Sequence, residues 1–121
     1  MQTQLKTKRE TDSTTKVEDW GTLTWLASGP LTGSALTLGR VIIHPGKSNP
    51  RHAHDNCEEV LYLLAGHLRH SFGDRAVDMG PGDTLVVPAG VPHNAVNTGD
   101  ADADMIVAYS SGDRGFREEN G

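Results

Sequence analysis

Turn-forming residues interrupt this chain at short intervals, and their spacing limits the possible folds more than any other sequence pattern. The apolar or alternating runs between the turns have the length of strands and lie at residues 23–27, 35–43, 59–65, 68–72, 84–87, 95–97 and 105–109. The turn-forming segments are Gly29-Pro30, Pro45-Gly46, Asn49-Pro50, Gly73-Asp74, Gly80-Pro81-Gly82, Pro88-Ala89-Gly90 and Thr98-Gly99-Asp100. They leave no room for a helix, so the chain is predicted to be all-β.

The length of the chain and the number of runs predict one closed β structure. A chain of 121 residues has room for a single domain with one core. Short strands in an open sheet would leave exposed edges, which favours a sandwich or a closed barrel, and we assign it to residues 17–112. Residues 1–16 have little apolar content and are predicted to form a flexible arm. In the tail, residues 113–121, only Arg114, Phe116 and Arg117 are expected to pack back.

Charge and cysteine content exclude several classes of partner. Residues 17–121 hold seven Lys or Arg and fourteen Asp or Glu, so this part carries a charge near −7, which disfavours nucleic acid. No run approaches the roughly 18 apolar residues of a membrane span, and no apolar segment of a secretion signal follows the basic residues near the N-terminus. The single cysteine cannot form an internal disulfide. We therefore expect no membrane partner and a cytoplasmic location.

Histidine and glutamate gather in two short blocks that have the spacing of metal ligands. His52 and His54 are two residues apart, so in an extended segment they lie on one face with Cα atoms about 6.8 Å apart. Both can then approach one ion at about 2.1 Å. Glu59 begins the next apolar run and can supply an oxygen across a turn. In the second block, Pro88 and neighbouring turn formers build a rigid corner that presents His93.

Together, the two blocks resemble the two sequence motifs of the cupin superfamily. The first motif reads G-x5-H-x-H-x(3,4)-E-x6-G and the second reads G-x5-P-x-G-x2-H-x3-N, and every specified position is matched. The short spacer, residues 67–81, resembles that of compact single-domain (RmlC-like) members. The matching residues are Gly46, His52, His54, Glu59 and Gly66 in the first motif and Gly82, Pro88, Gly90, His93 and Asn97 in the second.

This resemblance implies both a fold and a ligand set. The fold is a double-sheet jelly-roll barrel, the cupin double-stranded β-helix, in which His52, His54, Glu59 and His93 bind one divalent transition metal ion. Such ligands suit Fe, Mn, Ni, Co or Zn and do not choose between them. The alternative is a metal-free member that keeps the four residues as a polar cluster. An ion is favoured because three buried imidazoles beside a carboxylate would otherwise be poorly satisfied.

Other polar residues in and near the two motifs receive structural roles. Glu58 is predicted to face solvent, because neighbouring residues of a strand point to opposite faces and Glu59 fits the motif. Cys57 is interpreted as a small buried hydrophobic residue. Asn97 is expected to close the following Asn-Thr-Gly turn with its side chain. We place His44 and His67 at the rim or on the surface.

His70 is the candidate catalytic residue outside the motifs. It alternates with Leu68 and Phe72, which predicts that it shares their inward face. Counting the alternation continuously from Glu59 puts His70 outside instead, unless a bulge or turn at Gly66 shifts the phase. Only the inward placement would make His70 an acid or base beside the metal.

The functional hypothesis is a metal-dependent small cupin acting on a small polar oxygen-rich substrate. A sugar, sugar acid or oxyacid would bind at the open metal positions and undergo Lewis-acid isomerase or lyase chemistry. An Fe(II)-dependent dioxygenase and a non-catalytic small-molecule binding module are the alternatives. We also expect a homodimer, because the first strand bears Trp20 and Trp25 and would offer apolar surface and an edge to pair.

Overall fold

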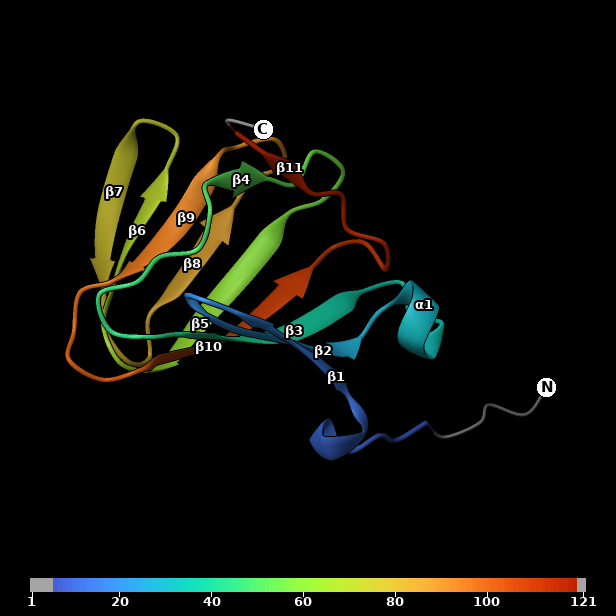
Figure 1. The fold of residues 1–121 in the computed structure, drawn as a ribbon. Helices are drawn as coiled ribbons and strands as arrows, with labels where there is room; N and C mark the ends of the chain where they lie inside the picture. Colours follow the sequence, from blue (N-terminus) through green and yellow to red (C-terminus); the bar gives the residue numbers. More distant parts are fainter. Residues whose placement is uncertain (1–5, 120–121) are drawn as a thin grey trace.

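The computed structural model describes residues 6–119, and its strands form two antiparallel sheets that face each other (Figure 1). The larger sheet has the order β1 (Thr14–Glu18), β2 (Gly21–Ala27), β3 (Thr37–Ile43), β10 (Ala103–Tyr109), β5 (Glu59–Ala65) and β8 (Thr84–Val87). The smaller sheet has the order β11 (Arg117–Glu118), β4 (His52–Ala53), β9 (His93–Asn97), β6 (Leu68–Phe72) and β7 (Arg75–Met79). The predicted all-β jelly roll is confirmed.

The core lies between the two sheets and follows the period of two that strands impose. In β5 the odd residues Leu61 and Leu63 are buried, whereas the even residues Val60 and Tyr62 are exposed. Strand β10 runs through the centre of the larger sheet, and its Val107 lies opposite Leu61 of β5 on one side and Gly39 of β3 on the other. Burying these apolar side chains from both sheets is the main stabilising term of the fold.

Two short helices depart from the prediction that no helix would form. One is the 3-10 turn η1 (Glu10–Asp12), and the other is the single α-helical turn α1 (Gly29–Thr32). The Ser28 side chain caps α1 by accepting from Leu31 N at 3.2 Å, and Gly33 ends it with φ of 68°. The pair Gly29-Pro30 predicts a turn, but proline is equally compatible with the first residues of a helix, which is where Pro30 lies. Within residues 6–119, no helix has the length and apolar content of a membrane span.

Both ends of the described chain add to the sheets. Strand β1 begins at Thr14, so residues 14–16, which we assigned to the arm, pair with β2. In the tail, β11 pairs with β4, with Arg117 opposite Ala53. Arg117 also donates to the Asp55 carboxylate at 2.9 and 3.1 Å. The tail therefore pairs with the strand that carries His52 and that His54 directly follows.

Candidate metal centre and its pocket

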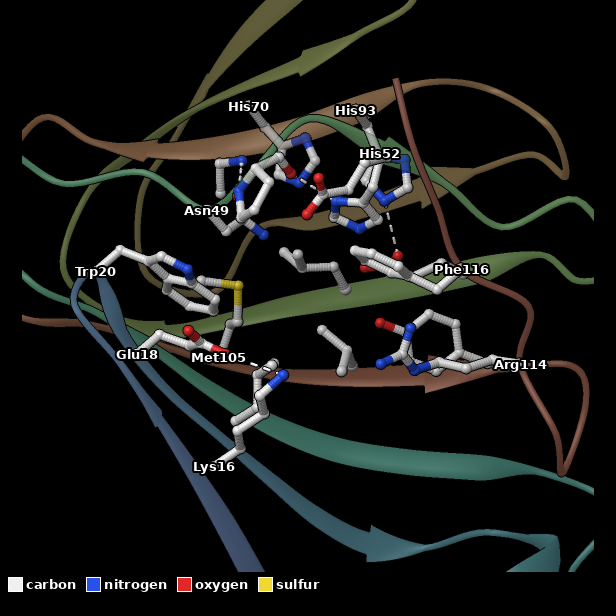
Figure 2. A pocket seen from close by; sticks show the side chains of 18 of the residues that line it. Lys16, Glu18, Trp20, Asn49, His52, His70, His93, Met105, Arg114 and Phe116 are labelled. Carbon is white, nitrogen blue, oxygen red and sulfur yellow. Dashed lines mark hydrogen bonds and ion pairs between the residues drawn. The ribbon is translucent and has the colours of Figure 1, made fainter. Parts of the chain in front are cut away.

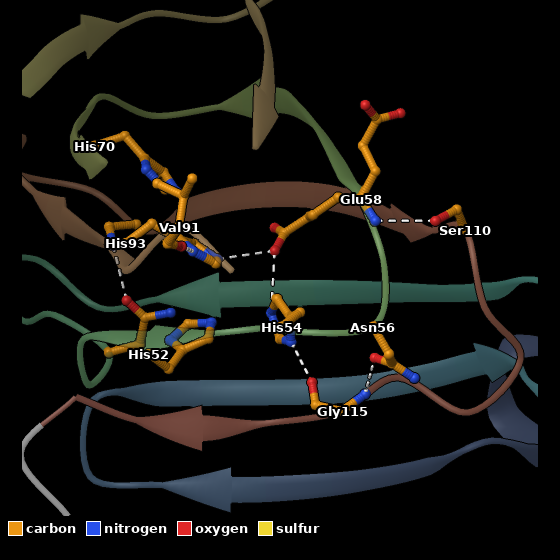
Figure 3. Close-up of polar contacts among 12 residues, drawn as sticks. His52, His54, Asn56, Glu58, His70, Val91, His93, Ser110 and Gly115 are labelled. Carbon is orange, nitrogen blue, oxygen red and sulfur yellow. Dashed lines mark hydrogen bonds and ion pairs between the residues drawn. The ribbon is translucent and has the colours of Figure 1, made fainter. Parts of the chain in front are cut away.

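Four buried side chains from three different elements meet between the sheets (Figure 3). His52 lies on β4, His54 follows β4, Glu59 begins β5 and His93 begins β9. Strands β4 and β9 pair so that His52 lies opposite His93. One donor atom from each of the four side chains lies within 4.8 Å of the other three. These four residues can therefore hold one metal ion between them, as the sequence motifs implied.

Backbone carbonyls fix the orientation of all three imidazoles. The Nδ1 atoms of His52, His54 and His93 donate to the carbonyl oxygens of Pro50 at 2.7 Å, Gly115 at 2.7 Å and Val91 at 2.9 Å. A carbonyl can only accept, so each Nδ1 carries the proton and each Nε2 is left with its lone pair in the neutral ring. This tautomer is the one that a metal-binding imidazole needs.

The polar atoms of the cluster would be better satisfied by a bound cation than by their contacts with one another. His54 Nε2 is fully buried and has no hydrogen-bond partner, although Glu59 Oε1 lies 3.2 Å away. The same carboxylate oxygen is 3.0 Å from His93 Nε2. A buried nitrogen without a partner is rare in proteins, and an ion between the nitrogens and the carboxylate would satisfy it.

Burial and mutual contacts shift the pKa values within the cluster. Burial alone would raise the pKa of Glu59, but its contacts with His54 and His93 hold that pKa well below the usual range. Burial lowers the pKa of His52 to about 4, so this ring stays neutral at ordinary pH. For His93, burial lowers the pKa, but the contact with Glu59, the charge of that carboxylate and the bond to the Val91 carbonyl together outweigh burial, so the net shift is upward. The carboxylate is therefore anionic.

His70 lies inside the jelly roll and beside the cluster. Its side chain is buried and lines the pocket, and its ring stacks on that of His93 with centroids 5.7 Å apart. Burial lowers its pKa to about 4, and its Nδ1 donates to the Ser71 carbonyl at 3.1 Å. The inward placement results from the turn at Gly66, whose φ of +89° shifts the phase between β5 and β6. The first of our two alternative readings of the alternation is therefore correct.

A pocket of about 360 Å³ adjoins the cluster, and His52, His70 and His93 lie together along one side of it (Figure 2). Its polar end contains His52, Glu59, His70 and His93, with Asn49 at the edge. Its other walls combine apolar and aromatic side chains with four charged residues, Lys16, Glu18, Arg114 and Glu118. Gly39 makes room for one of the aromatic side chains, because a Cβ there would lie 2.8 Å from the Trp25 ring. The apolar and aromatic lining residues are Trp20, Leu23, Trp25, Pro50, Leu61, Ala95, Met105, Val107, Tyr109 and Phe116.

The two tryptophans correct one expectation and add to the site. We expected Trp20 and Trp25 to form surface for a dimer, but both line the pocket. Trp25 pairs with Gly39 of β3 in the sheet. Side chains alternate between the two faces along β2, and at this position the indole points inward. Sequence reasoning also missed the role of Phe116, whose ring stacks on His52 with centroids 4.9 Å apart. The sequence held one sign of this role, because Phe116 is an isolated aromatic residue in a polar, glycine-containing tail.

The remaining polar residues lie where the sequence analysis placed them. Glu58 is exposed, and Cys57 is buried, which raises the pKa of its thiol. Asn97 Oδ1 accepts from Gly99 N at 2.8 Å and so closes the predicted turn. His67 is exposed, and His44 Nδ1 lies 3.0 Å from Asp102 Oδ1 outside the pocket. None of these residues belongs to the cluster of donor atoms.

The fold and the cluster define a class of protein: an antiparallel jelly roll with three histidines and a glutamate between its sheets, arranged so that they could hold a metal ion. Within that class, the chain belongs to the cupin family. The family model described as Cupin domain matches residues 39–109, which include all four cluster residues and His70. The resemblance stated from the sequence motifs is thereby confirmed.

Individual relatives agree with this assignment. Germin-like protein 3-8 of Oryza sativa subsp. japonica is 35% identical over 81 residues, which is 63% of this chain and 36% of that protein. The polyketide cyclase RemF from Streptomyces resistomycificus superimposes with a TM-score of 0.79 at 23% identity, over 96% of this chain and 86% of RemF. Oxalate decarboxylase of Lactobacillus farciminis gives 0.85 at 20% identity, over 91% of this chain and 34% of that one. These two structural likenesses show the fold.

Proposed function

We propose that the protein is a metal-dependent cupin enzyme that acts on a small oxygen-bearing substrate by isomerase or lyase chemistry. In this proposal His52, His54, Glu59 and His93 are the ligands of one divalent transition metal ion. The observation that carries the proposal is the arrangement of the four donors, with one nitrogen from each of three imidazoles and one carboxylate oxygen within 4.8 Å of one another. The partnerless Nε2 of His54 gives separate support.

The chain's own residues would bind, orient and move protons. An ion such as Fe, Mn, Ni, Co or Zn would supply Lewis acidity that stabilises negative charge on a substrate oxygen. Carbonyls of Pro50, Gly115 and Val91 hold the imidazoles in the ligating tautomer. His70, with its pKa lowered to about 4, is neutral near pH 7 and can accept a proton from a bound substrate. The apolar part of the pocket wall would limit the access of water to the reacting groups.

Metal content tests the ligand set. Protein purified without chelator should contain one equivalent of a first-row metal by elemental analysis, and the double variant His52→Ala/His54→Ala should contain almost none. His44→Ala/His67→Ala is the matched control, because it removes two histidines that lie outside the cluster. Metal at about 100 times its Kd should also stabilise the wild type by about 2.7 kcal/mol relative to chelator-treated protein, and should not stabilise the double variant. Equal metal in both double variants would contradict the proposal.

The reaction class needs a second measurement. A screen of oxyacids and sugar acids with the metal-loaded protein should reveal turnover without consumption of oxygen. Oxygen uptake by iron-loaded protein would favour a dioxygenase, and tight binding without turnover would favour a binding module. On a substrate found in this way, His70→Gln should keep its metal while turnover falls by roughly 10²- to 10⁴-fold.

A further inference from the structure

Arg114 lies in the wall of the pocket and projects into it (Figure 2). Its guanidinium carbon is 4.3 Å from the centroid of the Trp25 ring, 5.3 Å from that of Tyr109 and 5.5 Å from that of Phe116. A guanidinium that packs against ring faces keeps its N–H donors, which point outward in its own plane, available for other partners. The aromatic rings therefore position Arg114 without using its hydrogen-bonding edge.

Arg114 differs in this respect from most arginines of the fold. Within the described residues its guanidinium makes no ion pair and no hydrogen bond, although it is only partly exposed. The arginines that pair with carboxylates are Arg40, Arg51, Arg69 and Arg117. A cation with unused donors that faces a pocket is suited to an anionic group of a ligand.

The charges around the pocket also favour an anion. Lys16 and Glu18, which line its outer part, form an ion pair at 3.1 Å and so largely cancel each other. At the inner end, Glu59 would leave a bound divalent ion with one net positive charge. Arg114 then adds a second positive charge on the other side of Phe116, whose ring contacts His52. The pocket thus has a positive group at each of these two places. Glu118 also lines the pocket, and it lies on the exposed strand β11, where solvent screens its charge.

The surface between these two positive groups is apolar. Leu61, Met105 and Val107 line the pocket together with Trp20. Such walls offer few partners for the hydroxyl groups of a sugar, and burying hydroxyl groups there would cost free energy. The same walls suit a ligand with a hydrocarbon or aromatic body.

We infer that the pocket binds an organic acid with an apolar, ring-bearing body, whose carboxylate is bound by Arg114. This inference deepens the proposed function, because it selects oxyacids with apolar bodies over sugars and sugar acids as substrates. The metal would take an oxygen at the inner end of the same ligand. Recognition by Arg114 does not itself require the ion, so the two can be tested separately.

Tryptophan fluorescence provides a direct binding assay, because Trp20 and Trp25 are the chain's two tryptophans and both line the pocket. The probes are 3-phenylpropanoate, its neutral amide 3-phenylpropanamide, and D-gluconate. The wild type should bind 3-phenylpropanoate at least about 10-fold more tightly than either of the others. Arg114→Gln should weaken binding of the acid by roughly 10- to 100-fold, the range for a hydrogen bond to a charged group, and leave the affinity for the amide unchanged.

Two further variants separate recognition from folding. Arg75→Gln is the matched control, because Arg75 also lies over an aromatic ring, 5.5 Å from that of Phe72, but outside the pocket. Arg114→Lys keeps the charge and should retain part of the preference for the acid. If Arg114→Gln binds the acid as tightly as the wild type, or loses the amide equally, the inference is wrong. Tighter binding of D-gluconate than of 3-phenylpropanoate would overturn it as well.

Each titration should be run on chelator-treated and on metal-reloaded protein. A preference for the acid that depends on Arg114 in the chelator-treated protein supports the inference whether or not a metal binds. If no sample takes up metal but this preference persists, the proposed metal-dependent function fails and the inference stands. If metal binds at the four ligands but Arg114→Gln changes nothing, the inference fails and the metal site stands.

Discussion

Asn97 connects three backbone groups through one buried amide. Its Nδ2 donates to the carbonyls of Ile43 and Ala101, each at 2.8 Å, and its Oδ1 accepts from Gly99 N at 2.8 Å. The side chain therefore joins the end of β9 to the end of β3 and closes the turn that leads toward β10. Sequence reasoning found the turn but had no means of finding the contact with Ile43, which is 54 positions away.

We predict that Asn97→Ala lowers the free energy of unfolding by roughly 2–3 kcal/mol, because three backbone groups lose a partner in a buried setting. The urea midpoint, followed by circular dichroism, measures this loss. Thr98→Ala, which changes the exposed neighbouring residue, should alter stability by less than about 0.5 kcal/mol. A loss for Asn97→Ala no larger than for Thr98→Ala would show that water replaces the amide.

At the same scale, three of the four cluster residues could be predicted from the sequence because their spacing is local, and the resemblance to the cupin motifs added His93, which lies 34 positions beyond Glu59. His52 and His54 share one short segment, and Glu59 follows within one turn. The contacts that complete the site are not local. The carbonyl that orients His54 belongs to Gly115, 61 positions away, and nothing in either motif indicates it. Arg114 was expected to pack back, but its position on the pocket wall depends on how the tail crosses the sheets.

At the scale of elements, Gly66 decides which face of β6 looks inward. The sequence left two phases open, since alternation within each strand was clear but the turn between the strands was not. With φ of +89° and no side chain, Gly66 fits between its neighbours, whereas a Cβ would lie 2.7 Å from both Ala103 Cα and Asp102 O. The glycine thus sets the register that brings His70 into the pocket.

Replacing Gly66 by alanine should therefore cost more than replacing a comparable glycine. Gly73 also has a positive φ, 59°, but a Cβ there would meet nothing within 4 Å. We predict that Gly73→Ala costs about 1–2 kcal/mol from backbone strain alone and that Gly66→Ala costs clearly more, because steric overlap is added. Thermal unfolding of both variants compares them directly. Equal losses would mean that the turn between β5 and β6 moves away from the start of β10 easily.

Strand elements also differed in how well the sequence predicted them. The bounds of β5, β6 and β8 match the predicted runs, because each is apolar or alternating and flanked by turn formers. The strands β4, β7 and β11 lie outside the predicted runs, and so does β1, whose first three residues we assigned to the arm. Strands β4 and β11 are only two residues long, and four of the five residues of β7 are exposed, so none has an apolar pattern to detect. Their pairing partners, rather than their own propensities, make them strands.

For the whole molecule, the expectation of a homodimer now rests on a different surface. Trp20 and Trp25 are inside the pocket, but the outer face of the larger sheet exposes Val60, Tyr62 and Val86. Contiguous apolar side chains on a sheet face favour association. We predict a mass in solution of about twice the 13.0 kDa of one chain. Light scattering over a dilution series measures it, and a mass near 13.0 kDa at micromolar concentrations is the contrary outcome.

The position of the tail has a consequence for biosynthesis. Both His54, through the Gly115 carbonyl, and the centre of the larger sheet, through β10, depend on residues beyond 100. When only the first hundred residues have left the ribosome, all four cluster residues have been synthesised, but neither β10 nor the Gly115 carbonyl is present. Because such a domain folds as a unit, the ligand set is assembled only after translation has passed β11. If the four residues bind a metal as proposed, its loading would come late in synthesis, and a half-made chain would not trap an ion in a partial site.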